Sequence, residues 1–297
     1  TGAATAGATA AATAASVGAP AGGGDKTITV GSKNFTEQFI LGELYAQALE
    51  AKGYTVNRKL NLGSEQIADR ALQSGQIDMY PEYTGTALGA ILKIEDTPAT
   101  PEETYNVVKE GYAKRNPSVT LLQPADFNNT YGIVVRREIA EQYNLKTLED
   151  LAKASPNLIF ASFSEFQDRA DGFPNIQKNY PGMNFKDIVL VNSLGLRYAA
   201  LEKGDADVGV GFQTDGQIAS QDLAVMEDPK NIWPFYYPAP AVRTEYLEAH
   251  PEIRDILNSV SETLDLETMQ ELNALVDIEK EDPADVASDF LEEQGLK

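Results

Sequence analysis

The sequence predicts an α/β protein that is long enough for two domains, and three observations lead to this prediction. Short β-rich runs alternate with helical patterns after residue 25. Such alternation is typical of a mostly parallel sheet flanked by helices. The 297 residues are enough for two domains. Neither an internal repeat nor a long linker interrupts the core, so we expect crossing strands to join the two lobes.

Six runs are predicted to be strands because β-branched and aromatic residues dominate them. A seventh run, "YPEYTGT" at residues 80–86, allows two interpretations. It is either a buried strand end, with Pro81 marking where pairing stops, or a loop that forms one wall of a binding site. The six strands are expected at residues 26–30, 54–60, 130–138, 157–163, 186–193 and 205–212.

Helices are predicted where capping residues flank a helical pattern. Thr100, Pro101 and Glu103 form a capping box with proline at the first helical position, which is a strong start signal. The chain is expected to be helical from Thr244 onward. The other helices are expected at residues 36–52 before Gly53, 64–74 with Ser64 as N-cap and Gly75 behind it, 147–155, 196–204, 251–264 and 283–295.

The chain is strongly acidic, with a formal net charge of −21. This charge argues against binding to a nucleic-acid backbone or to anionic lipid, because both would be repelled. Sixteen Asp and Glu stand against three Lys and Arg between Thr244 and Lys297, so most of the excess lies there. We interpret these residues as solvated helical faces; adaptation to salty surroundings is the alternative.

The chain contains no cysteine, which excludes disulfides, thiolate metal sites and cysteine nucleophiles. No apolar run reaches the length that a membrane-spanning helix needs. Residues 1–24 consist mainly of Ala, Thr and Gly, and this composition is typical of a flexible tether. A tether before a folded domain suits a protein held to a surface.

Catalytic motifs are missing from the sequence. His250 is the only histidine and is expected at the surface, so neither a Ser-His-Asp system nor a usual zinc ligand set can be assembled. The stretch at residues 209–216 has Thr214 in place of the third glycine of the dinucleotide fingerprint. It also has Val210 where a calcium loop requires glycine. We therefore expect no enzymatic activity, no metal and no cofactor.

Aromatic and cationic residues near strand ends and turns point to a binding site instead. Each ring alone is better explained by core packing. Together they suit a ligand with a cationic end, which the rings would face, and an anionic end, which the cations would bind. The residues are Tyr83, Tyr131, Phe212 and Tyr236 among the aromatics, and Lys33 and Arg169 among the cations.

A family resemblance makes this reading specific. The motifs "VGSKNFTEQFILGELYAQALE", "YPEYTGT", "FNNTYG", "EFQDRADGF", "LRYAALEKGDADV" and "QTDGQI" occur in this order and cover almost the whole chain after residue 25. In this respect the chain resembles the substrate-binding proteins of osmoprotectant ABC importers, which bind glycine betaine, carnitine or choline. The resemblance implies the type II periplasmic-binding-protein fold, with ligand in the cleft between two α/β lobes.

The resemblance also implies where the lobes and the site lie. One lobe would comprise residues 25–129 plus 233–297, and the other residues 130–232. The aromatic cage would consist of Tyr83, Tyr131, Phe212 and Tyr236, and the carboxylate clamp of Lys33, Thr86 and Arg169. Phe212 departs from the pattern, because tyrosine is expected there; the ring face is kept but the hydroxyl is lost.

The implied function is capture of glycine betaine or a similar carboxylated betaine outside the cytoplasm, by a monomer, for delivery to a membrane permease. The protein is expected to be either a membrane-anchored lipoprotein, with the anchor cysteine just before Thr1 and residues 1–24 as its tether, or periplasmic. A receptor for choline, carnitine or another betaine is the alternative. An enzyme on the same fold, such as a porphobilinogen-deaminase-like protein, is a further alternative, but it is excluded because its cofactor is attached through a cysteine and the chain has none. The effector domain of a transcription regulator is the last alternative; it would need a basic helix-turn-helix segment, and the Ala- and Thr-rich residues 1–24 stand where that segment would be.

Overall fold

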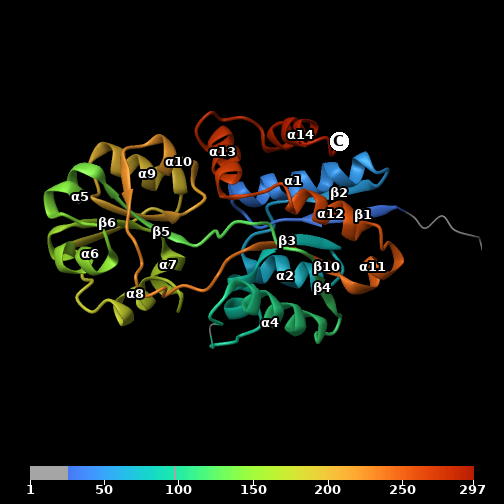
Figure 1. The fold of residues 1–297 in the computed structure, drawn as a ribbon, viewed down its shortest axis with the longest axis horizontal. Helices are drawn as coiled ribbons and strands as arrows, with labels where there is room; N and C mark the ends of the chain where they lie inside the picture. Colours follow the sequence, from blue (N-terminus) through green and yellow to red (C-terminus); the bar gives the residue numbers. More distant parts are fainter. Residues whose placement is uncertain (1–25, 97) are drawn as a thin grey trace, which may run out of the picture.

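Two lobes, each built on one mixed sheet, make up the chain in the computed structural model, which describes residues 26–96 and 98–297 (Figure 1). The predicted tether at residues 1–24 lies outside the described residues. The α/β class with two lobes is confirmed. The first sheet has the order β2-β1-β3-β10-β4 and the second β7-β6-β8-β5-β9. The strands are β1 (Thr27–Gly31), β2 (Thr55–Lys59), β3 (Met79–Tyr83), β4 (Val119–Leu121), β5 (Tyr131–Arg136), β6 (Ile159–Ser162), β7 (Asp187–Leu190), β8 (Val208–Phe212), β9 (Leu223–Val225) and β10 (Pro238–Arg243).

Helices flank both sheets, as Figure 1 shows. The first lobe has α1 (Thr36–Ala51), α2 (Glu65–Gln73), α3 (Thr84–Thr86), the π-helix η1 (Ala87–Ile91), α4 (Pro101–Ala113), α11 (Thr244–Ala249), α12 (Ile253–Ser261), α13 (Leu266–Asp277) and α14 (Pro283–Glu293). The second lobe has α5 (Arg137–Tyr143), α6 (Leu148–Ala154), the 3₁₀-helix η2 (Ser155–Asn157), α7 (Ser164–Asp168), α8 (Phe173–Asn179), α9 (Leu194–Lys203) and α10 (Gly216–Ser220). Every helix and strand predicted from the sequence has a counterpart here, with ends shifted by a few residues.

Strand direction within each sheet is mixed. In the first sheet β1 runs parallel to β2 and β3, whereas β10 runs antiparallel to β3 and β4. In the second sheet β6 runs parallel to β7 and β8, whereas β5 runs antiparallel to β8 and β9. The antiparallel strands β5 and β10 are the ones that arrive from the other lobe, so they enter their sheets in the opposite direction.

Proline lies inside two paired strands of the first sheet, which the sequence did not predict. One of the two interpretations of residues 80–86 had pairing stop at Pro81, but this residue lies opposite Pro240 in the register of β3 and β10. The carbonyl of Pro240 points to the other side and accepts a hydrogen bond from Leu122 N at 2.9 Å. Because neither proline has an N–H group to satisfy, the pair disturbs the sheet little. The interpretation in which pairing stops at Pro81 is therefore wrong.

Helix starts follow the predicted capping residues in one case and only partly in another. The Thr100 side chain accepts a hydrogen bond from Glu103 N at 3.1 Å, which confirms the predicted start of α4. Ser64 occupies the N-cap position of α2, but its hydroxyl donates to Gln66 Oε1 at 3.1 Å instead of capping the helix. The predicted N-cap position of Ser64 is confirmed, but its side chain does not cap the helix.

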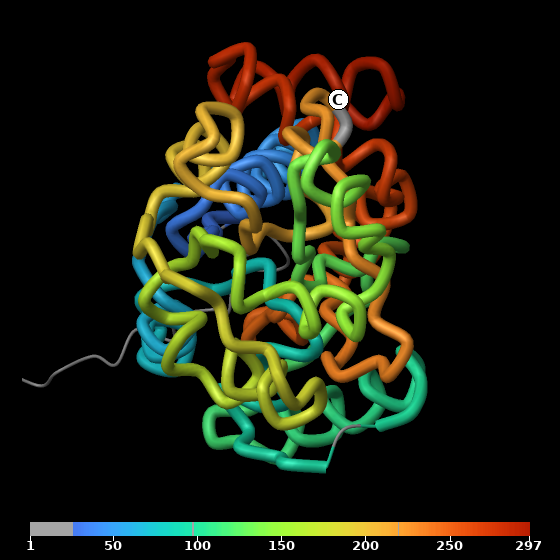
Figure 2. The backbone as a smooth tube through the Cα atoms, turned by 90° about the vertical axis from the view of Figure 1, so that its left-hand side faces the viewer, coloured from blue at the N-terminus to red at the C-terminus, as the bar shows by residue number. Residues whose placement is uncertain are grey.

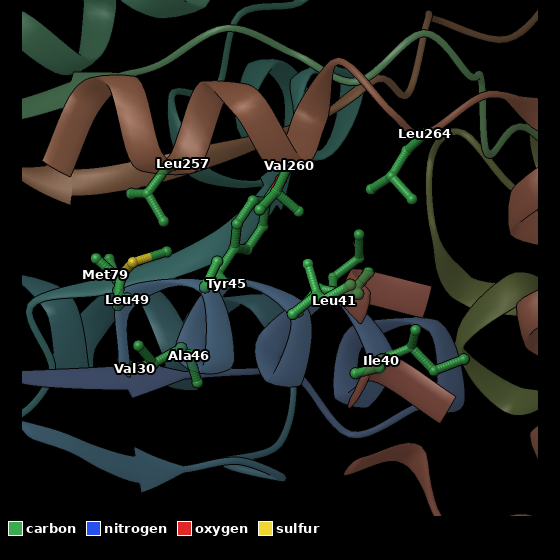
Figure 3. Packing of buried hydrophobic residues seen from close by; sticks show 14 of the residues in the cluster. Val30, Ile40, Leu41, Tyr45, Ala46, Leu49, Met79, Leu257, Val260 and Leu264 are labelled. Carbon is green, nitrogen blue, oxygen red and sulfur yellow. The ribbon is translucent and has the colours of Figure 1, made fainter. Parts of the chain in front are cut away.

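Helix α1 forms the centre of the first lobe's core. Figure 3 shows its side chains reaching toward the sheet on one side and toward α12 on the other. The helix is buried nearly all round because α12, α13 and α14 also pack on it. Tyr45 is fully buried, and its hydroxyl pairs with Ser261 Oγ at 3.0 Å. This packing fixes the N-terminal end of α1, which faces the second lobe.

Two segments cross side by side between the lobes, one before β5 and one before β10 (Figure 1). Asn129 N donates to Tyr236 O at 3.0 Å, and Tyr236 N donates to Asn128 Oδ1 at 2.8 Å. These bonds couple the two crossings over a short length, as a hinge requires. The boundaries at 129/130 and 232/233 stay predictions.

Two surface expectations have different outcomes. His250 is wrongly predicted to be exposed: it is 9% exposed, stacks on Tyr246 at 4.7 Å between ring centroids and meets the edge of Tyr54. Of the sixteen acidic residues between Thr244 and Lys297, all but Asp277 are exposed, as expected of solvated helical faces.

Among the described residues, no helix has both the length and the apolar character needed to cross a membrane.

Candidate functional site

A cavity of about 530 Å³ lies between the two lobes. The N-terminal part of α1 and the ends of β3 and α13 line it from the first lobe, and α7, α9 and the ends of β5 and β8 line it from the second. All seven residues predicted for the site line this one cavity: Lys33, Tyr83, Thr86, Tyr131, Arg169, Phe212 and Tyr236.

Strand register brings two of the aromatic rings together. Tyr131 is the first residue of β5 and Phe212 the last of β8, and these residues pair directly in the antiparallel ladder. Residues opposite each other in such a ladder have neighbouring side chains. Their rings stack with centroids 5.5 Å apart and planes 27° from parallel. Tyr236 meets Tyr131 edge-on at 6.0 Å, so three of the four predicted cage rings form one cluster.

Tyr83 forms the wall contributed by β3. Its hydroxyl donates to Glu37 Oε1 at 2.6 Å, and its ring stacks on Phe35 with centroids 6.1 Å apart. Lys33 Nζ lies 4.4 Å from the Tyr83 ring centroid. A protein cation therefore already uses this ring, which no sequence pattern indicated.

Lys33 also forms a buried ion pair. Its Nζ lies 2.5 Å from Glu82 Oε1, and both side chains are almost completely buried. Glu82 additionally accepts hydrogen bonds from Tyr80 Oη at 2.8 Å and from Tyr83 N at 2.7 Å. Most of the charge of Lys33 is thus balanced inside the protein, so its attraction for a ligand carboxylate is weaker than the sequence suggested.

Arg169 joins the two lobes across the cleft. Its Nε and Nη2 donate to Asp171 at 2.8 and 2.6 Å, and its Nη1 lies 3.6 Å from Glu65 Oε1 of the first lobe. Tyr236 Oη donates to Asp171 Oδ2 at 2.6 Å. Although burial opposes ionisation, the bonds from Arg169 and Tyr236 hold the pKa of Asp171 below its ordinary value. The clamp arginine and one cage ring are therefore held by the same carboxylate.

Glu37 is a buried carboxylate of the cleft that the site prediction did not include. Its Oε1 accepts bonds from Tyr83 Oη and from Asn129 Nδ2 at 2.8 Å, and its Oε2 accepts one from Asn273 Nδ2 at 3.0 Å. Burial raises the pKa of Glu37, and hydrogen bonds from Tyr83, Thr214, Asn273 and Asn129 oppose the rise. Asn273 Nδ2 also donates to Thr214 O at 2.9 Å, so the network reaches the second lobe.

Asp215 is a second buried carboxylate lining the cavity. It accepts hydrogen bonds from Tyr198 Oη at 2.7 Å and from Phe212 N at 2.8 Å. Burial raises its pKa to about 7, although these bonds and the nearby Arg197 favour the charged form. Asp215 holds the end of β8 in place and so positions the Phe212 backbone.

The family is decided by sequence comparison. Residues 26–293 match the profile of the substrate-binding domain of ABC-type glycine betaine transport systems. The chain belongs to this family. A glycine-betaine-binding protein of Pseudomonas aeruginosa is 36% identical over 281 residues, which cover 91% of this chain and 89% of that protein. The resemblance found in the sequence motifs is therefore confirmed.

Two further relatives extend the comparison. The Helicobacter pylori ergothioneine transport permease/ergothioneine binding protein EgtU is 34% identical over 273 residues, which cover 92% of this chain and 48% of that protein. A crystal structure of a glycine betaine/carnitine/choline ABC transporter superposes with a TM-score of 0.78 at 30% identity, covering 91% of this chain and 99% of that one. Membership of the family makes the chain an extracytoplasmic component of an ABC transporter that binds a small molecule.

Sequence reasoning missed the carboxylates of this family member's cleft. Glu37 lies within the quoted motif "NFTEQ" and Asp171 within "QDRADGF", but nothing local distinguishes them from surface acids. Both carboxylates also make contacts across the fold: Glu37 meets Asn273, and Asp171 meets Tyr236. The lobe arrangement that brings such distant residues together has no local signature.

Proposed function

We propose that the chain is a non-enzymatic receptor that captures glycine betaine, or a similar carboxylated quaternary ammonium solute, and delivers it to the permease of an ABC importer. The observation that carries the proposal is the gathering of four rings and two cations in one cleft. A trimethylammonium group has no N–H to donate, so aromatic faces suit it. Arginine and lysine suit the carboxylate at the other end.

The cage would consist of Tyr83, Tyr131, Phe212 and Tyr236, and the clamp of Lys33, Thr86 and Arg169. The name of the Pseudomonas relative supports the glycine betaine assignment. We also propose that the protein acts as a monomer and is held to the membrane by a lipid anchor. Closure of the lobes over the ligand would produce the form that the permease recognises.

A bulkier betaine is the second candidate, and the cavity volume favours it. A volume of 530 Å³ lies within the range of about 300–1,000 Å³ that is usual for pockets of drug-sized ligands, and glycine betaine is much smaller. Ergothioneine, for which the Helicobacter relative is named, carries both a trimethylammonium group and a carboxylate. Carnitine also carries both groups, whereas choline carries only the first.

A ligand-dependent melting-temperature screen tests the proposal. The panel comprises glycine betaine, carnitine, ergothioneine and choline, each at the same concentration. A ligand that binds only the folded state raises the melting temperature, and at equal concentration the tighter ligand raises it more. We expect the carboxylated betaines to raise it more than choline does. A screen in which none of the four compounds shifts the transition would contradict the proposed function.

A further inference from the structure

Glu37 is a buried carboxylate of the cleft whose hydrogen-bond partners, among the described residues, include no cation. It is 3% exposed, lies at the N-terminal end of α1 and lines the cavity between the lobes. Within residues 26–96 and 98–297, no lysine, arginine or histidine contributes to its hydrogen bonds or to its pKa. Its donors are the neutral side chains of Tyr83, Asn129, Asn273 and Thr214.

Several neighbouring carboxylates, in contrast, have a cation nearby. Glu82 is paired with Lys33, and Arg169 is shared by Asp171 and Glu65. Asp215 feels the positive charge of Arg197. A buried carboxylate without a cation is costly, because the ionised form loses its hydration. The donors around Glu37 would be matched to that ionised form, since a carboxylate only accepts hydrogen bonds.

The position of Glu37 connects its charge to the proposed cage. The Tyr83 hydroxyl donates to Glu37 Oε1 at 2.6 Å, so the carboxylate lies at the rim of that ring. A quaternary ammonium over the ring face would sit within a few ångströms of the carboxylate, in a cleft where water screens charges poorly. Asn273 links the same carboxylate to Thr214 of the second lobe. Both lobes thus contribute to the surroundings of this charge.

We infer that Glu37 provides the counter-charge for the cationic head group of the ligand, and that it is a specificity-determining residue that selects cations over neutral molecules of the same shape. This inference rests on the proposed function, because it assumes a ligand with a quaternary ammonium group. It goes beyond the cage and clamp, which supply ring faces and cations but no negative charge for the ligand. The ligand would complete an ion pair that the protein leaves half made.

A purely structural role is the competing explanation, since Glu37 also holds the Tyr83 hydroxyl. The two roles differ in their effect on ligands of equal shape. Loss of a support for the ring would weaken binding of a cation and of its neutral isostere alike. Loss of a counter-charge would weaken binding of the cation only.

The test is calorimetric titration of the wild type and Glu37→Gln with glycine betaine and with 3,3-dimethylbutanoate, in which carbon replaces the quaternary nitrogen. We expect the ratio of the two affinities to fall about tenfold in Glu37→Gln, the change expected when one charge is removed near another in a cleft of reduced dielectric. Glu37→Asp keeps the charge and should keep the ratio, even if both affinities fall. Glu50→Gln, at the exposed end of the same helix, controls for net charge and should leave the ratio unchanged.

The outcomes separate this inference from the proposed function. An unchanged ratio in Glu37→Gln, a lost ratio in Glu37→Asp, or equal binding of both compounds by the wild type would overturn the inference. If Glu37→Gln does not fold, the affinity ratio in Glu37→Asp can still overturn the inference. If the wild type binds choline but no betaine, the proposed ligand is wrong, and the comparison is made with choline and 3,3-dimethylbutan-1-ol. If no trimethylammonium compound binds, both proposals fail.

Discussion

Asp215 shows how a single buried carboxyl can make stability depend on pH. Its pKa of about 7 in the folded protein exceeds the value of 3.8 expected for the unfolded chain. Between these values the folded state binds more protons than the unfolded state. The free energy of unfolding therefore falls as pH rises from about 4 to about 7 and is constant with respect to this group above that.

We predict that Asp215→Asn removes this dependence. Three pKa units correspond to about 4 kcal/mol, so the variant should gain up to that amount over the wild type as pH rises through the window. Asparagine can still accept the bond from Phe212 N. Chemical denaturation of both proteins at several pH values measures the difference. Parallel stability curves across pH 4 to 7 would contradict the prediction.

Residue types were predictable from the sequence, but their partners were not. Lys33, Arg169 and the four rings reach the predicted cavity because they follow strands or lie in turns that meet at the cleft. The sequence could not indicate that Glu82 neutralises Lys33 or that Asp171 and Glu65 share Arg169. Such pairs depend on side-chain directions set by tertiary packing. Carboxylates are so frequent in this chain that no pattern marks these few.

Helices α10 and α13 form the contact between the lobes that lies beside the cleft, and Figures 1 and 2 show the two helices next to each other. Asn273 Nδ2 donates to Thr214 O at 2.9 Å and Gln270 Nε2 to Gln213 O at 2.7 Å. A Cβ atom added to Gly216 would lie 2.6 Å from Ala274 Cα and 2.7 Å from Ala274 N. Backbone atoms cannot move aside as side chains do, so the helices would have to separate.

We predict that Gly216→Ala folds normally but weakens ligand binding about tenfold, because it disfavours the arrangement in which the lobes touch. Small-angle scattering should show that ligand reduces the radius of gyration less than in the wild type. Gly89→Ala is the matched control, since nothing lies within 4 Å of a Cβ at that exposed position. Wild-type affinity and compaction in Gly216→Ala would show that this contact is not part of closure.

Helices and strands were predicted correctly from the sequence where the local residue preferences agree with the tertiary structure. Thr100 caps the start of α4 as predicted, although Glu103 accepts from Ala99 N and so does not complete the capping box. Strand β10 was missed because "PAPAVR" contains two prolines, which usually exclude a central strand. It lies inside the first sheet, between β3 and β4, because Pro240 faces Pro81, where neither residue needs an N–H group. The rule that excludes proline from interior strands failed there because the residue opposite Pro240 is also a proline and requires no N–H donor.

For the whole molecule, alternation of strands and helices predicted the class, and ordered motifs predicted the two-lobed architecture. The mixed strand direction was not predicted, since it follows from β5 and β10 crossing between lobes. The cleft depends on both lobes at once, and Arg169 illustrates this dependence. It belongs to the second lobe, lies 3.6 Å from Glu65 of the first and would bind the ligand's anionic end.

The central claim is that this cleft recognises a betaine by its two ends, and calorimetric titration with glycine betaine and choline tests it most directly. Both ligands offer the same trimethylammonium group, so only the carboxylate distinguishes them. Because Asp171 and Glu65 already engage Arg169, we expect the wild type to prefer glycine betaine by about tenfold, less than the effect of an unshared buried charge pair. Arg169→Ala should lose most of that preference. Equal binding of both ligands by the wild type, or an undiminished preference in Arg169→Ala, would contradict the account.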